Sequence, residues 1–310
     1  MSDLCIAWSP SSFCAVDDAP LRVLHGVGAR VVGNPYGRRL TEAEITAHIK
    51  DADGLIAGLE PLQRSVLTAA PKLRAIARVG IGLDNVDLDA AHELGIRISN
   101  TPDAPAESVA ELTVAAALAL VRGLCADNRA VHEGSWEKAV RPGLKGSEVL
   151  LVGYGRIGRA VGRALTALGA HVLVTDPALG NESTPGIRPV TLDEGLRRAL
   201  VVSLHADGRD CIIRSRELAL MREGSVLLNS ARGELVDEQA LVNALRSGRL
   251  AGAWFDVFWR EPYTGPLTEF DQVLLTPHVG TYTEGCRRDM ELRATINLLR
   301  DLGVSHDASP

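Results

Sequence analysis

A glycine-rich turn between two apolar segments constrains the fold of this chain more than any other feature. Residues 149–152 are apolar and lead into Gly153-Tyr-Gly155-Arg-Ile-Gly158, a helical pattern follows, and a second apolar run ends at Asp176. The motif G-x-G-x-x-G binds a dinucleotide where it follows a strand and leads into a helix and a second strand that ends in an acid. The stretch therefore predicts a βαβ unit whose turn holds a pyrophosphate. The alternative is a glycine-rich turn of some other α/β protein.

Each position of this motif has a physical role. Gly153 permits the tight turn, Gly155 lets the backbone approach the pyrophosphate, and Gly158 lets the helix pack closely on the strand. The start of the helix offers free N–H groups and partial positive charge to that anion. Asp176 stands where a carboxylate accepts from a ribose hydroxyl and repels a 2′-phosphate, so NAD is favoured over NADP.

Composition and charge exclude several classes of protein. The chain of 310 residues is 46% hydrophobic, its net charge is −6, and its basic residues are scattered, so we expect a globular enzyme that binds no nucleic acid. No apolar run reaches membrane-spanning length, and the first residues lack the basic region of a signal peptide. The five cysteines show neither metal-ligand spacing nor a disulfide framework, which favours reduced thiols in the cytoplasm and no metal site.

Short apolar segments alternate with helical patterns along both halves of the chain, which indicates parallel βαβ units. We expect two doubly wound domains of the α/β class: a Rossmann NAD-binding domain at 101–282, inserted in a flavodoxin-like substrate domain made of 1–100 and 283–310. The alanine-rich helix at 106–124 would link the domains or contact another subunit. Outside the glycine motif, strands are expected at 4–8, 30–33, 54–57, 75–78, 96–99, 200–205, 225–230, 251–257 and 273–276, and helices at 41–50, 62–70, 88–94, 106–124, 214–221, 237–247 and 282–302.

Three polar residues follow predicted strand ends after the glycine motif. Hydride transfer at a C–OH carbon needs a base for the hydroxyl proton and a cation that holds the substrate. His278 has an intrinsic pKa suited to the base, Glu261 can bind its far nitrogen, and Arg232 can offer a bidentate fork to a carboxylate and carbonyl. Each residue alone is more often structural, but three at successive strand ends favour an active site.

Two loops before the glycine motif could bind the substrate. Leu59 and Glu60 follow a predicted strand end, where open α/β sheets bind ligands. Arg78 precedes Val79 and Gly80 in a second such loop, whose glycines leave backbone N–H groups free to bind an anion.

Several segments together carry a resemblance that covers nearly the whole chain. They are RVGIGLDNVD, NTPDAPAESVAELT, VGYGRIG, LVVSLH, LLNSARGELVDEQAL, DVFWREP and TPHVGTYT. In this order they resemble the D-isomer-specific 2-hydroxyacid dehydrogenase family, particularly its phosphoglycerate dehydrogenase-like branch. The resemblance implies an NAD-dependent oxidoreductase acting on D-2-hydroxy acids or 2-keto acids, a homodimer built through the nucleotide domain, and an active site in the interdomain cleft.

The resemblance also implies roles for particular residues. Arg232 would bind the substrate carboxylate and carbonyl, His278 would be the acid/base, and Glu261 its partner. The backbone at Val79 and Gly80 would hold the substrate carboxylate, and Asp256 would meet the nicotinamide carboxamide. Further cofactor contacts are expected from Arg156, Ile157, His205, Ala206, Ser230, Ala231 and Gly280.

Three features depart from the family's pattern. The loop after His205 is shortened, which puts the cover of the cofactor in doubt. Glu60 would repel a phosphate where phosphoglycerate enzymes often carry a basic residue, so a phosphate- or phosphonate-bearing substrate stays an open alternative. Trp254 and Trp259 flank Asp256 where smaller or polar residues are usual, and they either fill space in the core or, for Trp259, narrow the mouth of the cleft.

Two other functions fit the same fold. One is a non-catalytic NAD-sensing scaffold or corepressor, against which the complete set of Arg232, Glu261 and His278 argues. The other is a phosphite-type oxyanion dehydrogenase, which needs the same arginine and histidine.

Overall fold

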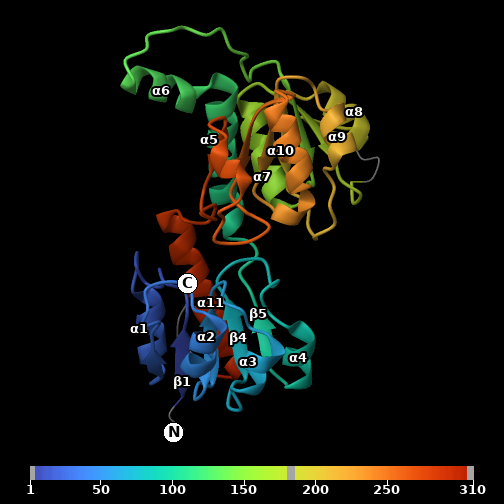
Figure 1. The fold of residues 1–310 in the computed structure, drawn as a ribbon. Helices are drawn as coiled ribbons and strands as arrows, with labels where there is room; N and C mark the ends of the chain where they lie inside the picture. The colour runs from blue at the N-terminus through green and yellow to red at the C-terminus, as the bar shows by residue number, and fades with distance from the viewer. Residues whose placement is uncertain (1–3, 180–185, 306–310) are drawn as a thin grey trace. The chain divides into compact units, whose positions relative to one another are not determined.

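The computed structural model describes residues 4–179 and 186–305, and the chain divides into two compact units (Figure 1). The first unit comprises the chain up to Pro105 and again from Thr281, and the second comprises Ala106–Gly280. Each unit is a parallel sheet with helices on both faces, as the alternating sequence pattern predicts.

The first unit contains a five-stranded parallel sheet in the order β2-β1-β3-β4-β5, the order of flavodoxin-like folds. In such a sheet the point where the strand order reverses, here between β1 and β3, opens a crevice at the carboxyl ends of the strands. The strands are β1 (Cys5–Trp8), β2 (Arg30–Val32), β3 (Gly54–Ala57), β4 (Ala75–Arg78) and β5 (Arg97–Ser99).

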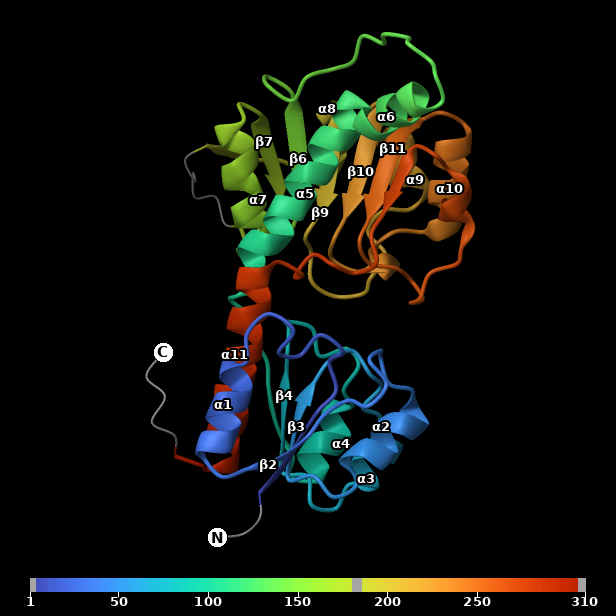
Figure 2. The same ribbon diagram turned by 90° about the vertical axis from the view of Figure 1, so that its left-hand side faces the viewer.

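Helices cover both faces of this sheet because alternate strand residues point to opposite sides. Ala7 packs with α2, α3 and α4, whereas its neighbour Ile6 packs with α1 and α11. The last helix, α11, thus returns to the first unit, where α1 and α11 lie side by side (Figure 2). The helices are α1 (Ala19–Gly26), α2 (Glu42–Ile49), α3 (Arg64–Thr68), α4 (Leu88–Glu93) and α11 (Glu284–Leu302).

The second unit contains a seven-stranded parallel sheet in the order β12-β11-β10-β9-β6-β7-β8. The strand order reverses between β6 and β9, so the loops after these two strands meet at the switch point where such sheets bind ligands. The strands are β6 (Glu148–Val152), β7 (His171–Thr175), β8 (Ile187–Pro189), β9 (Val201–Leu204), β10 (Ser225–Asn229), β11 (Leu250–Phe255) and β12 (Val273–Leu275).

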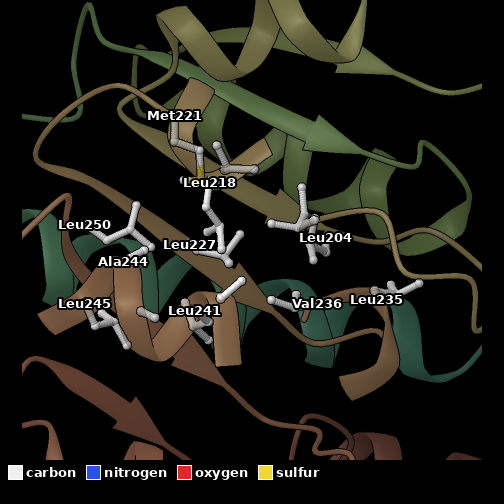
Figure 3. Packing of buried hydrophobic residues seen from close by; sticks show 14 of the residues in the cluster. Leu204, Leu218, Met221, Leu227, Leu235, Val236, Leu241, Ala244, Leu245 and Leu250 are labelled. Carbon is white, nitrogen blue, oxygen red and sulfur yellow. The ribbon is translucent and has the colours of Figure 1, made fainter. Parts of the chain in front are cut away.

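Two aliphatic clusters cover the faces of this sheet. Side chains of α5 and α7 pack on one face, where α5 crosses the strands (Figure 2). Side chains of α8, α9 and α10 pack on the other, and Figure 3 shows Leu241 of α10 against Leu227 of β10. The helices are α5 (Pro105–Arg122), α6 (Leu124–His132), α7 (Arg156–Ala167), α8 (Leu192–Arg198), α9 (Ser215–Leu220), α10 (Glu238–Arg246) and two 3₁₀ turns, η1 (Gly233–Leu235) and η2 (Pro266–Glu269).

In the part of the chain that the structure describes, the sequence pattern did not predict the helices α1, α6 and α8, the strand β8 or the 3₁₀ turns η1 and η2. It also ends α5 at Arg122, because Gly123 takes a left-handed conformation with φ +62° and the chain turns into α6. The single helix expected over 106–124 therefore corresponds to α5 and the first residue of α6.

Candidate active site

Two of the three glycines after β6, Gly153 and Gly158, are required by their surroundings. Gly153 has φ +95°, and a side chain there would lie 2.5 Å from the backbone nitrogen of Ala206. A side chain on Gly158 would collide with the carbonyl oxygen of Gly153, whereas the space beside Gly155 is open. Because Gly155 directly precedes α7, an anion can approach the free N–H groups of the helix there. The turn therefore fits a dinucleotide pyrophosphate.

Asp176 follows β7 and is bound to the same turn. Its Oδ2 accepts a hydrogen bond from the N–H of Tyr154 at 2.5 Å, and its Oδ1 accepts from the N–H of Ala178 at 2.7 Å. These bonds place the half-buried carboxylate beside the glycine turn, where the sequence predicts its contact with a ribose hydroxyl. At the start of α7, Arg156 is exposed and Ile157 packs on the aliphatic cluster.

His205 follows β9 and turns its ring nitrogens inward. Its Nε2 lies 2.8 Å from Oγ of Ser203, and its Nδ1 is buried without a hydrogen-bond partner in the described part of the chain. Burial lowers the pKa of His205 to about 4, so the ring is neutral at pH 7. The backbone of His205 and Ala206 lies directly against Gly153, so both residues support the glycine turn.

The neutral state of His205 makes the stability of the fold depend on pH. Its folded-state pKa of about 4 is below the ordinary 6.5, so acid protonates the unfolded chain first. The resulting contribution to the free energy of unfolding, about 3 kcal/mol, is complete above pH 6.5 and is lost as the pH falls to 4. In urea unfolding across this range, His205→Asn should lose less stability than the wild type. Parallel pH curves for the two proteins would contradict this account.

The turn after β10 is closed by one buried side chain. Asn229 accepts a hydrogen bond at Oδ1 from the N–H of Ala231 at 3.0 Å and donates from Nδ2 to the carbonyl oxygen of Arg232 at 2.8 Å. Ser230 lies in this turn, and its hydroxyl is 3.5 Å from that of Thr113 on α5. No role was predicted for Asn229, although an asparagine directly after a strand is a typical turn-forming residue.

The loop of Arg232 packs against the segment that leads to Glu261. A side chain on Gly233 would collide with the backbone of Phe258 and Trp259, so glycine is needed for this close approach. Arg232 itself is half-buried, and its Nη1 donates to the carbonyl oxygen of Ala231 at 2.7 Å.

Asp256 follows β11 and is almost fully buried, at 2% exposure. Its Oδ1 accepts from the hydroxyl of Thr276 at 2.6 Å and from the N–H of Val279 at 2.9 Å, and its Oδ2 accepts from the N–H of Gly280 at 2.8 Å. Both oxygens thus hold the loop that carries His278. The nicotinamide contact that the resemblance implies for Asp256 stays a prediction, and Gly280 belongs to the same hydrogen-bond network.

His278 and Glu261 lie side by side after β12 and β11. The Nδ1 atom of His278 is 3.1 Å from each carboxylate oxygen of Glu261, and Glu261 Oε1 also accepts from the N–H of Phe258 at 3.2 Å. The side chain of His278 is 36% exposed. Because Nδ1 faces the carboxylate, Nε2 is the nitrogen left to exchange a proton with a ligand.

In the first unit, the loop after β3 is held from inside. Glu60 is 1% exposed, and its carboxylate accepts hydrogen bonds from the hydroxyl of Ser9 and, at 2.9 Å, from the N–H of Gly58. Asn85 donates to the carbonyl oxygen of Glu60 at 2.7 Å. The structure does not support a Glu60 that faces a ligand and repels its phosphate, because the carboxylate is buried within the unit. Leu59 and Pro61 are the half-buried side chains of this loop.

The loop after β4 is also held by contacts within the first unit. The N–H of Val79 donates to the carbonyl oxygen of Ala57 at 2.9 Å, and the N–H of Gly80 donates to Oγ1 of Thr101 at 2.9 Å. Arg78 is buried, and its Nη1 donates to the carbonyl oxygen of Val79 at 2.5 Å. The N–H groups of Val79 and Gly80 therefore have acceptors within the unit, and their contact with a substrate carboxylate stays a prediction.

Residues 4–179 and 186–305 contain neither a candidate metal cluster nor a single membrane-spanning helix. Within these ranges no group of three or more His, Cys, Asp or Glu side chains could hold a metal ion. No single helix there is long and apolar enough to cross a membrane; α5 and α6 pass that test together by length and composition, but they are bent by 61°.

Comparisons with known proteins agree with this geometry. Residues 114–280 match the NAD-binding domain of D-isomer specific 2-hydroxyacid dehydrogenases. A hydroxypyruvate reductase of Thermotoga maritima is 34% identical over 278 residues, which cover 86% of this chain and 90% of the relative. A D-3-phosphoglycerate dehydrogenase of Mycobacterium leprae is 38% identical over 77% of this chain, which spans only 47% of that relative.

Solved structures give the same result. The TT0316 protein from Thermus thermophilus superimposes with a TM-score of 0.88 at 33% identity, covering 98% of this chain and 99% of that one. A glyoxylate reductase from Paecilomyes thermophila gives 0.82 at 28% identity, with 96% and 95% covered. The chain belongs to the D-isomer-specific 2-hydroxyacid dehydrogenases. It is an NAD-dependent oxidoreductase of the class that acts on CH–OH groups.

Proposed function

We propose that the protein reduces a 2-keto acid to the D-2-hydroxy acid, and reverses this reaction, with Arg232, Glu261 and His278 as its catalytic set. The observation that carries the proposal is the His278–Glu261 pair on the sheet edge that also bears the glycine turn. Because all strands of this sheet are parallel, the residues that follow β6, β7, β10, β11 and β12 share one edge, where such sheets bind ligands.

Each residue of the set has a task in the reduction. NADH, when bound, supplies a hydride to C2 of the keto acid. Arg232 would hold the carboxylate and polarise the carbonyl oxygen through its planar fork of N–H donors. His278 would donate the Nε2 proton to that oxygen, and Glu261 would stabilise the protonated imidazole and orient it through Nδ1. In the oxidation, the proton returns from the hydroxyl to Nε2.

For the substrate we propose a small 2-keto acid without a phosphate group. The loop Gly58-Leu59-Glu60-Pro61 carries no cation, and its half-buried side chains, Leu59 and Pro61, are both apolar. Relatives named hydroxypyruvate reductase and glyoxylate reductase support this class. The test is NADH oxidation with glyoxylate, hydroxypyruvate, 3-phosphohydroxypyruvate, phosphonopyruvate and branched 2-keto acids. Higher kcat/KM with a phosphorylated acid would overturn the substrate class, and no turnover with tight NADH binding would favour the non-catalytic scaffold.

We also propose a homodimer that buries α6 and the segment after it. Helix α6 has no buried residue, and large apolar side chains are exposed here, namely Leu124, Val131, Trp136 and Val140. Beside them lies a cavity of about 190 Å³ with apolar walls that include Leu120, Pro142 and Leu274. Exposed apolar patches of this kind mark interaction surfaces. A second copy of the chain is the proposed occupant because the resemblance implies a dimer built through this unit.

A charge placed on α6 tests this interface. In analytical ultracentrifugation the wild type should sediment at twice the mass of one chain, and Val131→Asp should sediment as a single chain, since a buried unpaired carboxylate opposes association. Asp127→Glu on the same helix is the control and should leave the dimer intact. An unchanged mass for Val131→Asp would contradict the proposed interface.

We place the protein in the cytoplasm. Its five cysteines are all free, as reducing compartments maintain them. Fractionation of the source cells tests this proposal. Recovery of the protein outside the cytoplasmic fraction would overturn it.

A further inference from the structure

The backbone of His278 needs external support. Its φ of +55° lies in the left-handed region, which is unfavourable for a residue with a side chain and persists only where the surroundings impose it. The loop is held on both sides of His278, because Asp256 accepts from Thr276 before it and from Val279 and Gly280 after it. The carboxylate of Asp256 thus fixes the backbone before and after His278 by three hydrogen bonds.

Trp254 joins this hydrogen-bond network through Thr276. This residue is 1% exposed and lies two positions before Asp256. Because side chains alternate along a strand, both side chains point to the same face of the sheet. Its indole Nε1 donates to the hydroxyl oxygen of Thr276 at 3.0 Å, and that hydroxyl lies 2.6 Å from Oδ1 of Asp256.

The direction of these hydrogen bonds follows from the groups themselves. An indole N–H can only donate, whereas a threonine hydroxyl carries one proton and can also accept. Since Trp254 occupies the oxygen of Thr276 as an acceptor, the hydroxyl proton is directed toward the Asp256 carboxylate. Trp254 therefore sets the orientation of the Thr276 hydroxyl, which donates to Asp256.

We propose that Trp254 is a positioning residue, which holds His278 in its working orientation through Thr276 and Asp256. The inference rests on the proposed role of His278 as acid/base. A tryptophan that only filled the aliphatic cluster would not need its N–H, whereas here the N–H reaches the loop of His278.

The test compares Trp254→Phe, which keeps an aromatic ring but removes the N–H, with Thr276→Val and the double variant. Each single change should lower kcat about 10- to 100-fold, because misplacing a catalytic group costs rate on this scale. The KM of NADH should stay within about threefold, since the glycine turn and Asp176 are untouched. The deuterium isotope effect with NADH labelled at C4 should rise as the chemical step becomes slower. Thr276→Ser should recover most of the kcat lost in Thr276→Val.

The double variant identifies the path of the effect. If Trp254 acts through Thr276, losing both should cost no more than losing one, whereas independent effects multiply. Trp8→Phe is the matched control; it removes an indole from the first unit and should leave kcat unchanged. Thr276→Val keeps the proposal testable even if Trp254→Phe does not fold.

Three results would overturn the inference: wild-type kcat in the folded Trp254→Phe variant, wild-type kcat in Thr276→Val, or multiplicative losses in the double variant. His278→Gln separates this inference from the proposed function. If His278→Gln keeps full turnover, the assignment of the base fails and the inference with it. If His278→Gln is inactive and Trp254→Phe is fully active, only the role of Trp254 fails.

Discussion

Replacing His278 by glutamine should lower kcat for 2-keto acid reduction by about 10²- to 10⁴-fold, the range that a positioned general acid contributes. Glutamine keeps a polar side chain of similar size but cannot carry the proton that Nε2 is proposed to donate. The affinity for NADH, measured by its fluorescence, should not change, because the glycine turn and Asp176 lie on other loops.

The carboxylate partner gives a graded companion to this experiment. Glu261→Gln removes the charge that faces Nδ1 but leaves His278 in place, so its loss of kcat should be smaller than that of His278→Gln. His92→Gln, on the exposed side of α4, is the control for histidine loss. Turnover at the wild-type rate in His278→Gln would show that another group moves the proton.

The sequence predicted the parts of the fold that are periodic and buried. Strand β10 was expected at 225–230 and is observed at Ser225–Asn229, because its five consecutive residues, most of them apolar, are buried on both faces of a parallel sheet. Two of the elements that were missed, α6 and β8, lack this signal. Helix α6 buries no residue in this chain, and β8 is a three-residue strand at the edge of the sheet that ends in Pro189.

In the candidate site, too, local sequence features could be predicted and contacts between distant segments could not. The glycine turn and the His278–Glu261 contact could be predicted, because glycine spacing and polar residues at strand ends are local features of the sequence. The inward-facing carboxylate of Glu60 could not, since its hydrogen-bond donor Ser9 follows a strand that is distant in sequence and adjacent only in the sheet. The network around Asp256 was missed for the same reason, as its donors come from the end of the next strand.

The largest effect on substrate binding is expected from Arg232. A hydrogen bond from a charged donor contributes about 1.5–3 kcal/mol, so losing a bidentate pair should lower kcat/KM for the keto acid by about 10²- to 10⁴-fold. Arg232→Lys keeps the charge but loses the planar fork, and it should fall between Arg232→Ala and the wild type. Steady-state kinetics with the best keto acid of the panel give these values.

Two further measurements make this prediction specific to the guanidinium group. Free guanidinium added to Arg232→Ala should recover part of the lost kcat/KM, because the side chain leaves a space on the loop that Asn229 holds in shape. Arg197→Ala, an exposed arginine of α8 paired with Asp193, should change neither kcat nor KM. Binding of NADH should be the same in all these variants, since Arg232 is proposed to contact the keto acid. If Arg232→Ala keeps the wild-type kcat/KM, the substrate carboxylate is bound by another cation.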